Sequence, residues 1–131
     1  MVIDCVATNR YMFYWIKTNR IIKKLFRHYV WDFPNADHKI YLTFDDGPIP
    51  EITEWVLHEL EKYNAKATFF CIVDNVRKYP EIFEKVVAKD HSIGNHTFNH
   101  LNGWNTSFEA YLENSFLFEE QILKSKIYNL K

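Results

Sequence analysis

The segment from Lys39 to Pro48 reads KIYLTFDDGP, a run of strand-forming residues that ends abruptly in two aspartates, a glycine and a proline. β-Branched and aromatic residues dominate 39–44, which predicts a strand, and the Gly-Pro pair predicts its end. In parallel α/β folds, the loops at the carboxyl ends of strands build the functional site. Asp45 and Asp46 are therefore candidate functional residues, although Asp-Gly pairs are also common in solvated turns.

Downstream of this segment, helical and strand-like patterns alternate. Helical periodicity predicts helices over Thr53–Tyr63, Glu81–Lys89 and Phe108–Ile127, and Ala67–Val73 and His91–Gly94 are predicted strands. Alternation of this kind is typical of parallel strands joined by right-handed crossovers, so we expect an α/β fold with about three βα units. The inward-facing candidates of the last helix are Tyr111, Leu112, Phe116, Ile122 and Leu123.

The overall composition is that of a folded domain without a nucleic-acid partner. Hydrophobic residues make up 47% and aromatic residues 18% of the 131 residues, which is enough to build a core. The formal net charge of −1 provides no bulk attraction for nucleic acid. Cys5 and Cys71 provide neither a disulfide framework nor a metal-ligand spacing. Cys71 lies in an apolar run, so we expect a buried thiol there.

Residues 1–31 differ in character from residues 32–131. They contain six lysines and arginines against a single aspartate, and residues 12–31 mix aromatic and basic residues at roughly helical spacing. Our preferred interpretation of 1–31 is a helix docked on the domain formed by 32–131. A basic amphipathic segment with Trp and Phe is also typical of a helix that lies on an anionic membrane surface, and this alternative stays open.

The sequence leaves the cellular compartment open. No stretch approaches the roughly 20 apolar residues of a membrane span. A cleavable signal peptide is also not recognisable, because the apolar patch 11–16 is short and no small-residue cleavage site follows it. A bacterial cytoplasmic location and a peripheral-membrane location are both compatible with these observations.

A second candidate site is the segment His96–His100, which reads HTFNH. Gly94 and Asn95 just before it end a predicted strand, so His96 is expected at a strand tip, as the Asp45-Asp46 pair is. The four-residue spacing brings both imidazoles to one side if a helical turn begins here. Isolated histidine pairs are often coincidental, but two such motifs at strand tips of one sheet bring a carboxylate and two imidazoles together. This pattern is typical of a hydrolytic metal site.

Both motifs resemble a known family. Thr43–Pro48 (TFDDGP) and His96–His100 (HTFNH) are similar to the first two signature motifs of the polysaccharide deacetylases, the family 4 carbohydrate esterases with a NodB-homology domain. Lys66–Phe70 (KATFF) and His91–Asn95 (HSIGN) also resemble that family. The resemblance runs from about Trp31 to the end and covers the N-terminal portion of the family's domain. It implies a truncated, distorted (β/α) barrel of the glycoside hydrolase/deacetylase type.

The same resemblance implies a function and a set of site residues. The implied activity is metal-dependent removal of acetyl groups from N-acetylated amino sugars, with an N-acetylated glycan as the substrate. Asp46, His96 and His100 would hold one divalent metal ion, and Asp45 would be the catalytic base. Zinc is the first expectation for the ion, with cobalt, nickel or manganese as alternatives, because imidazole and carboxylate ligands suit all four.

The sequence also departs from the family pattern. Val73 and Asp90 stand where the family usually has glycine, which tolerates backbone angles that other residues resist. The family's later motifs, which supply an arginine, a backbone oxyanion donor and a histidine acid, have no counterpart in these 131 residues. We therefore expect this chain alone to be a poor deacetylase. An inactive metal-binding remnant and a deacylase of non-sugar amides are the alternatives.

Trp104 follows the second motif and has two interpretations. Its side chain either stacks on a sugar ring or belongs to the core, since tryptophan in an apolar-rich loop is at least as often a core residue.

Overall fold

The structure is a computed structural model that describes residues 18–33 and 38–124. The chain divides into two compact units, Met1–Lys39 and Ile40–Lys131. The described part of the first unit contains the short helix α1 (Arg20–Leu25), where the Asn19 side chain accepts a hydrogen bond from the Ile21 N–H at 2.8 Å. Cys5 and residues 12–17 of the predicted N-terminal helix lie outside the described residues. The docked and membrane-surface interpretations both stay predictions.

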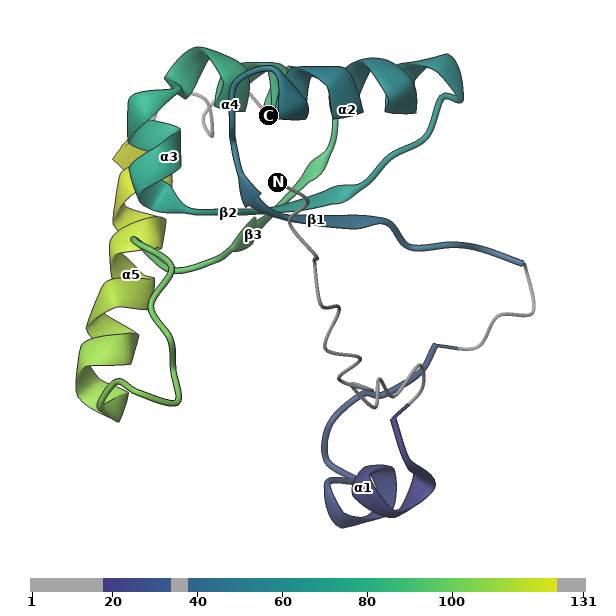
Figure 1. The fold of residues 1–131 in the computed structure, drawn as a ribbon, viewed down its shortest axis with the longest axis vertical. Coiled ribbons are helices and arrows are strands. Elements are labelled where there is room, and N and C mark those ends of the chain that lie inside the picture. The colour runs from purple at the N-terminus through teal and green to yellow at the C-terminus, as the bar shows by residue number, and fades with distance from the viewer. Residues whose placement is uncertain (1–17, 34–37, 125–131) are drawn as a thin grey trace, which may run out of the picture. The chain divides into compact units, whose positions relative to one another are not determined.

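The described part of the second unit is a parallel sheet whose strands alternate with helices (Figure 1). The strand order is β1-β2-β3, so β2 is central and forms parallel pairs with both neighbours. In chain order the elements are β1 (Thr43–Gly47), α2 (Ile52–Lys62), β2 (Thr68–Cys71), α3 (Val73–Lys78), α4 (Pro80–Ala88), β3 (Ser92–Asn95) and α5 (Phe108–Lys124). The α/β alternation predicted from the sequence is confirmed.

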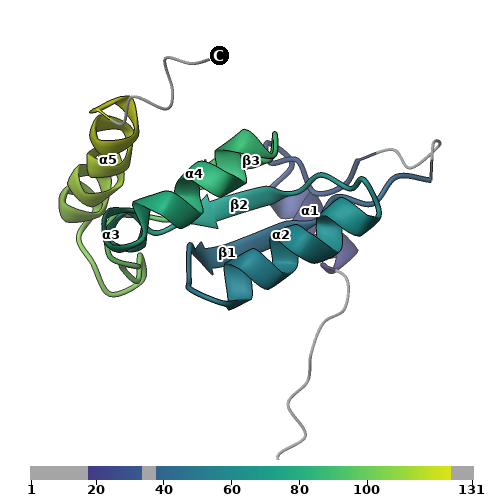
Figure 2. The same cartoon turned by 90° about the horizontal axis from the view of Figure 1, so that it is seen from above.

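Helices α2 and α4 cover the same face of the sheet, as the two views agree (Figures 1 and 2). The core lies between these helices and the strands. Successive strand residues point to opposite faces, so Phe69 and Cys71 of β2 are buried against the helices while Thr68 and Phe70 are half-buried. Burial raises the pKa of the free Cys71 thiol to about 12, which confirms the predicted buried cysteine. The core cluster comprises Leu57, Leu60, Ala67, Phe69, Cys71, Val73, Val76, Phe83, Val86, Phe118 and Ile122.

Helix α4 ends in a residue with left-handed backbone geometry. The Asp90 N–H donates to the Val87 carbonyl at 3.0 Å, and the His91 N–H donates to the Val86 carbonyl at 3.4 Å. This pair of bonds is a Schellman motif, whose left-handed residue is usually glycine. Asp90 has φ of 57°, which fits the glycine that the family resemblance implies at this position. Val73 instead starts helix α3 and is not among the positive-φ residues.

Two strand predictions need correction. Strand β1 begins at Thr43 rather than Lys39, because its pairing with β2 starts at Thr43 and Thr68. Strand β1 also extends to Gly47, so Asp45 and Asp46 lie within its end rather than after it. Strand β2 ends at Cys71, and the apolar residues that follow enter α3, a helix that was not predicted.

The inward face of α5 is rotated relative to the predicted face. Ile122 is buried and Tyr111 and Leu112 are half-buried, as predicted, but the prediction for Phe116 is wrong because it is 60% exposed. Phe118 is buried instead, because residues 111, 118 and 122 follow one stripe of the 3.6-residue period. The Leu123 side chain lies outside the described residues. No helix in the described ranges combines the length and hydrophobicity needed to cross a membrane.

Candidate metal centre

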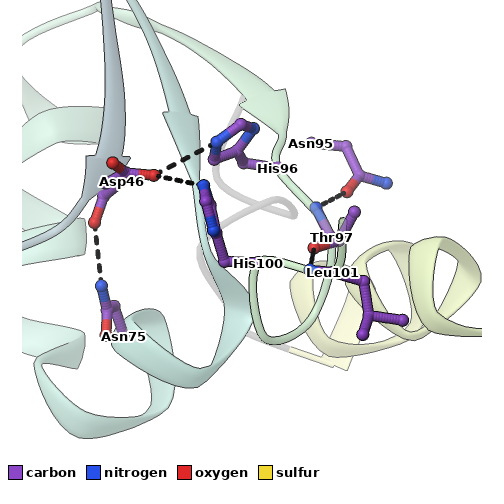
Figure 3. A network of polar contacts seen from close by, with 7 residues as sticks. All are labelled: Asp46, Asn75, Asn95, His96, Thr97, His100 and Leu101. Carbon is purple, nitrogen blue, oxygen red and sulfur yellow. Dashed lines mark hydrogen bonds and ion pairs between the residues drawn. The ribbon is translucent and has the colours of Figure 1, made fainter. Parts of the chain in front are cut away.

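A bulge at the end of β1 presents Asp46. Asp45 pairs with Phe70 and Gly47 pairs with Cys71, so Asp46 has no residue opposite it in β2. Its φ of 67° is left-handed, which is uncommon for a residue with a side chain. A single extra residue in a strand bends it locally and changes the direction of a side chain. The bulge thereby turns the Asp46 carboxylate toward two histidines (Figure 3).

The two histidines come from the segment that follows β3. The His96 N–H donates to the Cys71 carbonyl at 3.1 Å, which continues the sheet for one more residue. A turn over residues 97–99 then brings His100 back, so that the imidazole centroids lie 4.9 Å apart. Thr97 and His100 have φ of 64° and 60°. The predicted convergence is therefore present, but a turn with left-handed residues produces it rather than a helical turn.

The three side chains form a compact cluster (Figure 3). The Nε2 atoms of His96 and His100 each lie 3.2 Å from Oδ1 of Asp46. One ligand atom from each residue lies within 4.8 Å of the other two. The His100 and Asp46 side chains are 60% and 53% exposed, so the cluster is open to solvent on one side.

The donor set fits a divalent transition-metal ion. Ligand atoms that bind zinc at about 2.1 Å in a tetrahedral arrangement lie about 3.4 Å from one another. The two 3.2 Å separations between imidazole nitrogen and carboxylate oxygen are close to that value. Two imidazoles and a carboxylate also suit cobalt, nickel and manganese. Three protein ligands leave coordination positions for water and substrate, as catalytic sites require.

Asp45 is not a member of this cluster of described residues. It is exposed on β1, directly opposite Phe70 of β2, which in turn lies opposite Gly94 of β3. A Cβ atom at Gly94 would lie 2.3 Å from Cδ1 of Phe70, so only glycine leaves room for that ring. Asp45 is adjacent to Asp46 in the sequence but lies outside the three-residue cluster. Its role as a base stays a prediction.

Sequence reasoning missed the side chains that hold the histidine segment. The Asn95 side chain accepts from the Thr97 N–H at 2.8 Å, and the Thr97 hydroxyl accepts from the Leu101 N–H at 3.0 Å (Figure 3). Asn114 on α5 accepts from the Phe98 N–H at 2.8 Å. Asparagine often accepts from the amide two residues later in a turn, so Asn95 carried a recognisable signal. Asn114 carried none, because its partner is sixteen residues away.

Trp104 and His91 both lie outside the cluster. Trp104 is 97% exposed, so the core interpretation is wrong and sugar stacking stays a prediction. His91 is buried, and its Nδ1 accepts a hydrogen bond from the Ala67 N–H at 3.3 Å. This contact gives His91 a structural task at the opposite end of β3 from the cluster.

Comparison with known proteins identifies the family. The sequence profile of the polysaccharide deacetylases matches residues 33–127. This chain belongs to the polysaccharide deacetylase family. Within this family, a peptidoglycan-N-acetylglucosamine deacetylase from Bacillus cereus is 47% identical over 87 residues. The match covers 66% of this chain and 40% of that relative, so the chain spans well under half of its length.

Solved structures of polysaccharide deacetylases share the fold. The peptidoglycan deacetylase PdaC from Bacillus subtilis superposes with a TM-score of 0.61 at 34% identity, covering 66% of this chain and 42% of PdaC. A family 4 acetyl xylan esterase from Clostridium thermocellum, solved with a cobalt ion, gives a TM-score of 0.59 at 35% identity, covering 64% and 42%. The predicted fold class, part of a deacetylase-type (β/α) barrel, is confirmed.

Proposed function

We propose that this chain carries the metal-binding part of a hydrolase that removes acetyl groups from N-acetylated amino sugars. The observation that supports the proposal best is the cluster of Asp46, His96 and His100, whose ligand atoms lie within 4.8 Å of one another. These three residues hold one divalent ion. Zinc is the first candidate. The cobalt ion in the acetyl xylan esterase structure supports a divalent ion that accepts the same imidazole and carboxylate ligands. The name of the Bacillus cereus relative supports an N-acetylated glycan as the substrate class.

In this proposal the residues of the motifs 43–48 and 96–100 have two separate roles, metal binding and proton transfer. Asp46, His96 and His100 bind and orient the ion, which when bound supplies an acidified water and polarises the acetamide carbonyl. Asp45 lies outside the ligand cluster, and its carboxylate accepts a proton as water attacks the acyl carbon. The carbon–nitrogen bond then breaks, and the departing nitrogen takes up the proton that the attacking water gave to Asp45. The products are acetate and the free amino sugar.

Metal binding is tested first, with the 131-residue chain. We expect calorimetry with Zn²⁺ or Co²⁺ to show one bound ion, and the double substitution His96→Ala/His100→Ala to abolish binding. The matched control is His38→Ala/His58→Ala, which removes two exposed histidines outside the cluster and should leave binding unchanged. Equal affinity of the wild type and the His96→Ala/His100→Ala variant would contradict the proposal.

Deacetylation is tested in a protein of full family length. The chain is fused to the remaining segment of the Bacillus cereus relative, and acetate release from an N-acetylated chitooligosaccharide is measured. Asp45→Asn should keep the metal and lower kcat about 10²–10⁴-fold, the usual contribution of a general base. Full activity of Asp45→Asn would remove its role as the base. Metal binding without acetate release would favour the inactive metal-binding alternative.

A further inference from the structure

The bulge at Asp46 is held by a side chain that the metal cluster does not include. The carbonyl oxygen of Asp46 accepts a hydrogen bond from Nδ2 of Asn75 at 2.8 Å (Figure 3). One residue later, the Gly47 carbonyl accepts from the Ile72 N–H at 2.9 Å, so backbone pairing with the chain after β2 resumes immediately. The hydrogen bond from Asn75 therefore acts at the one residue of β1 that the ladder skips.

This hydrogen bond constrains the backbone at Asp46. The carbonyl belongs to the peptide plane that follows Asp46, so its orientation defines the ψ angle of that residue. Asp46 also has a left-handed φ of 67°, a conformation that persists for a residue with a side chain only where its surroundings impose it. Within the described residues, Asn75 contributes the side-chain hydrogen bond to this backbone unit.

Helix α3 connects this bulge to the histidine segment. The Val73 N–H donates to the Thr97 carbonyl at 3.2 Å, and the Asp74 N–H donates to the Phe98 carbonyl at 2.9 Å. Both carbonyls lie between the two histidines of the cluster. The buried side chains of Val73 and Val76 fix the same helix in the core. Residues 73–75 of α3 therefore bind, one after another, both backbone segments that carry the ligand atoms.

We propose that Asn75 is a positioning residue that holds the Asp46 carboxylate in register with His96 and His100. This inference rests on the proposed function, because it takes Asp46 as a metal ligand. Asn75 acts through the backbone of Asp46, whose carbonyl accepts its hydrogen bond. Partners in the shell around metal ligands typically change metal affinity 10–100-fold when they are removed, because the ligand then loses its fixed direction.

The test uses Co²⁺ as a probe in the 131-residue chain. Calorimetry gives the Kd, and the visible d–d absorption of Co²⁺ reports the number and geometry of its ligands. Asn75→Leu keeps the approximate shape of the side chain but lacks the donor, and we expect its Kd to rise about 10-fold or more with an altered d–d spectrum. Asn75→Ala also lacks the donor and favours the helix, so it repeats the test if the leucine variant does not fold.

The matched control is Val76→Ala, the next residue of α3, whose side chain is buried in the core. This substitution should lower stability and change the Kd and the spectrum much less than Asn75→Leu does, because it leaves the Asn75 donor in place. An equal loss of affinity in Val76→Ala would overturn the role of Asn75, because general weakening of α3 would then explain both results. Wild-type affinity and spectrum in Asn75→Leu would overturn this inference alone. Failure of the wild type to bind Co²⁺ would overturn the proposed metal site and this inference with it.

Discussion

Strand β3 is flanked by two histidines with opposite environments. His91 precedes the strand and is 5% exposed; its ring lies 5.3 Å from the Phe69 ring, and its Nδ1 accepts the Ala67 N–H. His96 follows the strand, is partly exposed, and directs Nε2 toward the Asp46 carboxylate. The lone pair on Nδ1 of His91 is occupied by the hydrogen bond from the Ala67 N–H. A metal ligand must keep such a lone pair available for the ion. Four residues of strand thus separate a packing residue from a candidate ligand.

The charges around the two histidines reinforce this difference. Burial is the main cause that lowers the pKa of His91, and the positive charges of Lys66 and Lys89 lower it further, while Asp90 opposes them. This surrounding disfavours any cation, whether a proton or a metal ion. At the other end of β3, the nearest charged partner of the imidazoles is the carboxylate of Asp46. The same residue type therefore suits a structural task at the amino end of the sheet and a ligand task at its carboxyl end.

The largest effect on stability is expected from substitution of His91, at the amino end of β3. His91→Ala removes a buried ring and leaves the Ala67 N–H without its acceptor, so we expect a loss of about 2–4 kcal/mol in the free energy of unfolding. The matched control His100→Ala removes an exposed ring and should change stability by less than about 0.5 kcal/mol. Urea unfolding followed by circular dichroism, without added metal, measures both. Equal losses in the two variants would mean that the contrast between the two ends is false.

A smaller effect appears as a pH dependence. Because the pKa of His91 is lowered from 6.5 in the folded chain, the unfolded chain takes up this proton first as the pH falls. The contribution of neutral His91 to the free energy of unfolding is therefore complete above the pKa of the unfolded chain. It is lost as the pH falls below about 6.5. His91→Gln keeps an acceptor but does not titrate. The stability difference between wild type and His91→Gln should shrink between pH 8 and pH 5, and a constant difference would contradict the assignment.

The smallest effect concerns the residue next to His91. Asp90→Gly places glycine at the left-handed position of the Schellman motif that ends α4, where φ is 57°. Relief of the left-handed strain exceeds the added entropy of the unfolded chain, so we expect a gain of about 0.5–1 kcal/mol. Thermal unfolding of the two proteins measures it. A loss of stability would show that the aspartate side chain contributes more than its backbone strain costs.

Regular elements with a strong apolar period were predictable from the sequence. Helix α2 was expected over Thr53–Tyr63 and extends over Ile52–Lys62, because Leu57 and Leu60 repeat at helical spacing and are both buried. Helix α3 was missed because its first residue, Val73, belongs to the apolar run that was predicted as a strand, and its six residues are too few to show a helical period. Phe116 was misassigned because an amphipathic pattern defines a stripe only to within one residue.

By itself the sequence determined the alternation of strands with helices, the family resemblance, and the four candidate residues Asp45, Asp46, His96 and His100, since these depend on local patterns and short motifs. The family resemblance implied that Asp46 acts with the two histidines and Asp45 apart from them, but only the tertiary structure shows how the chain brings the three side chains into one cluster. The cluster depends on a bulge, on left-handed residues, on a hydrogen bond that Asn75 donates across 29 positions of the chain, and on one that Asn114 accepts across 16 positions. Such contacts form only when distant segments pack together, and no local pattern in the sequence encodes which donor meets which carbonyl.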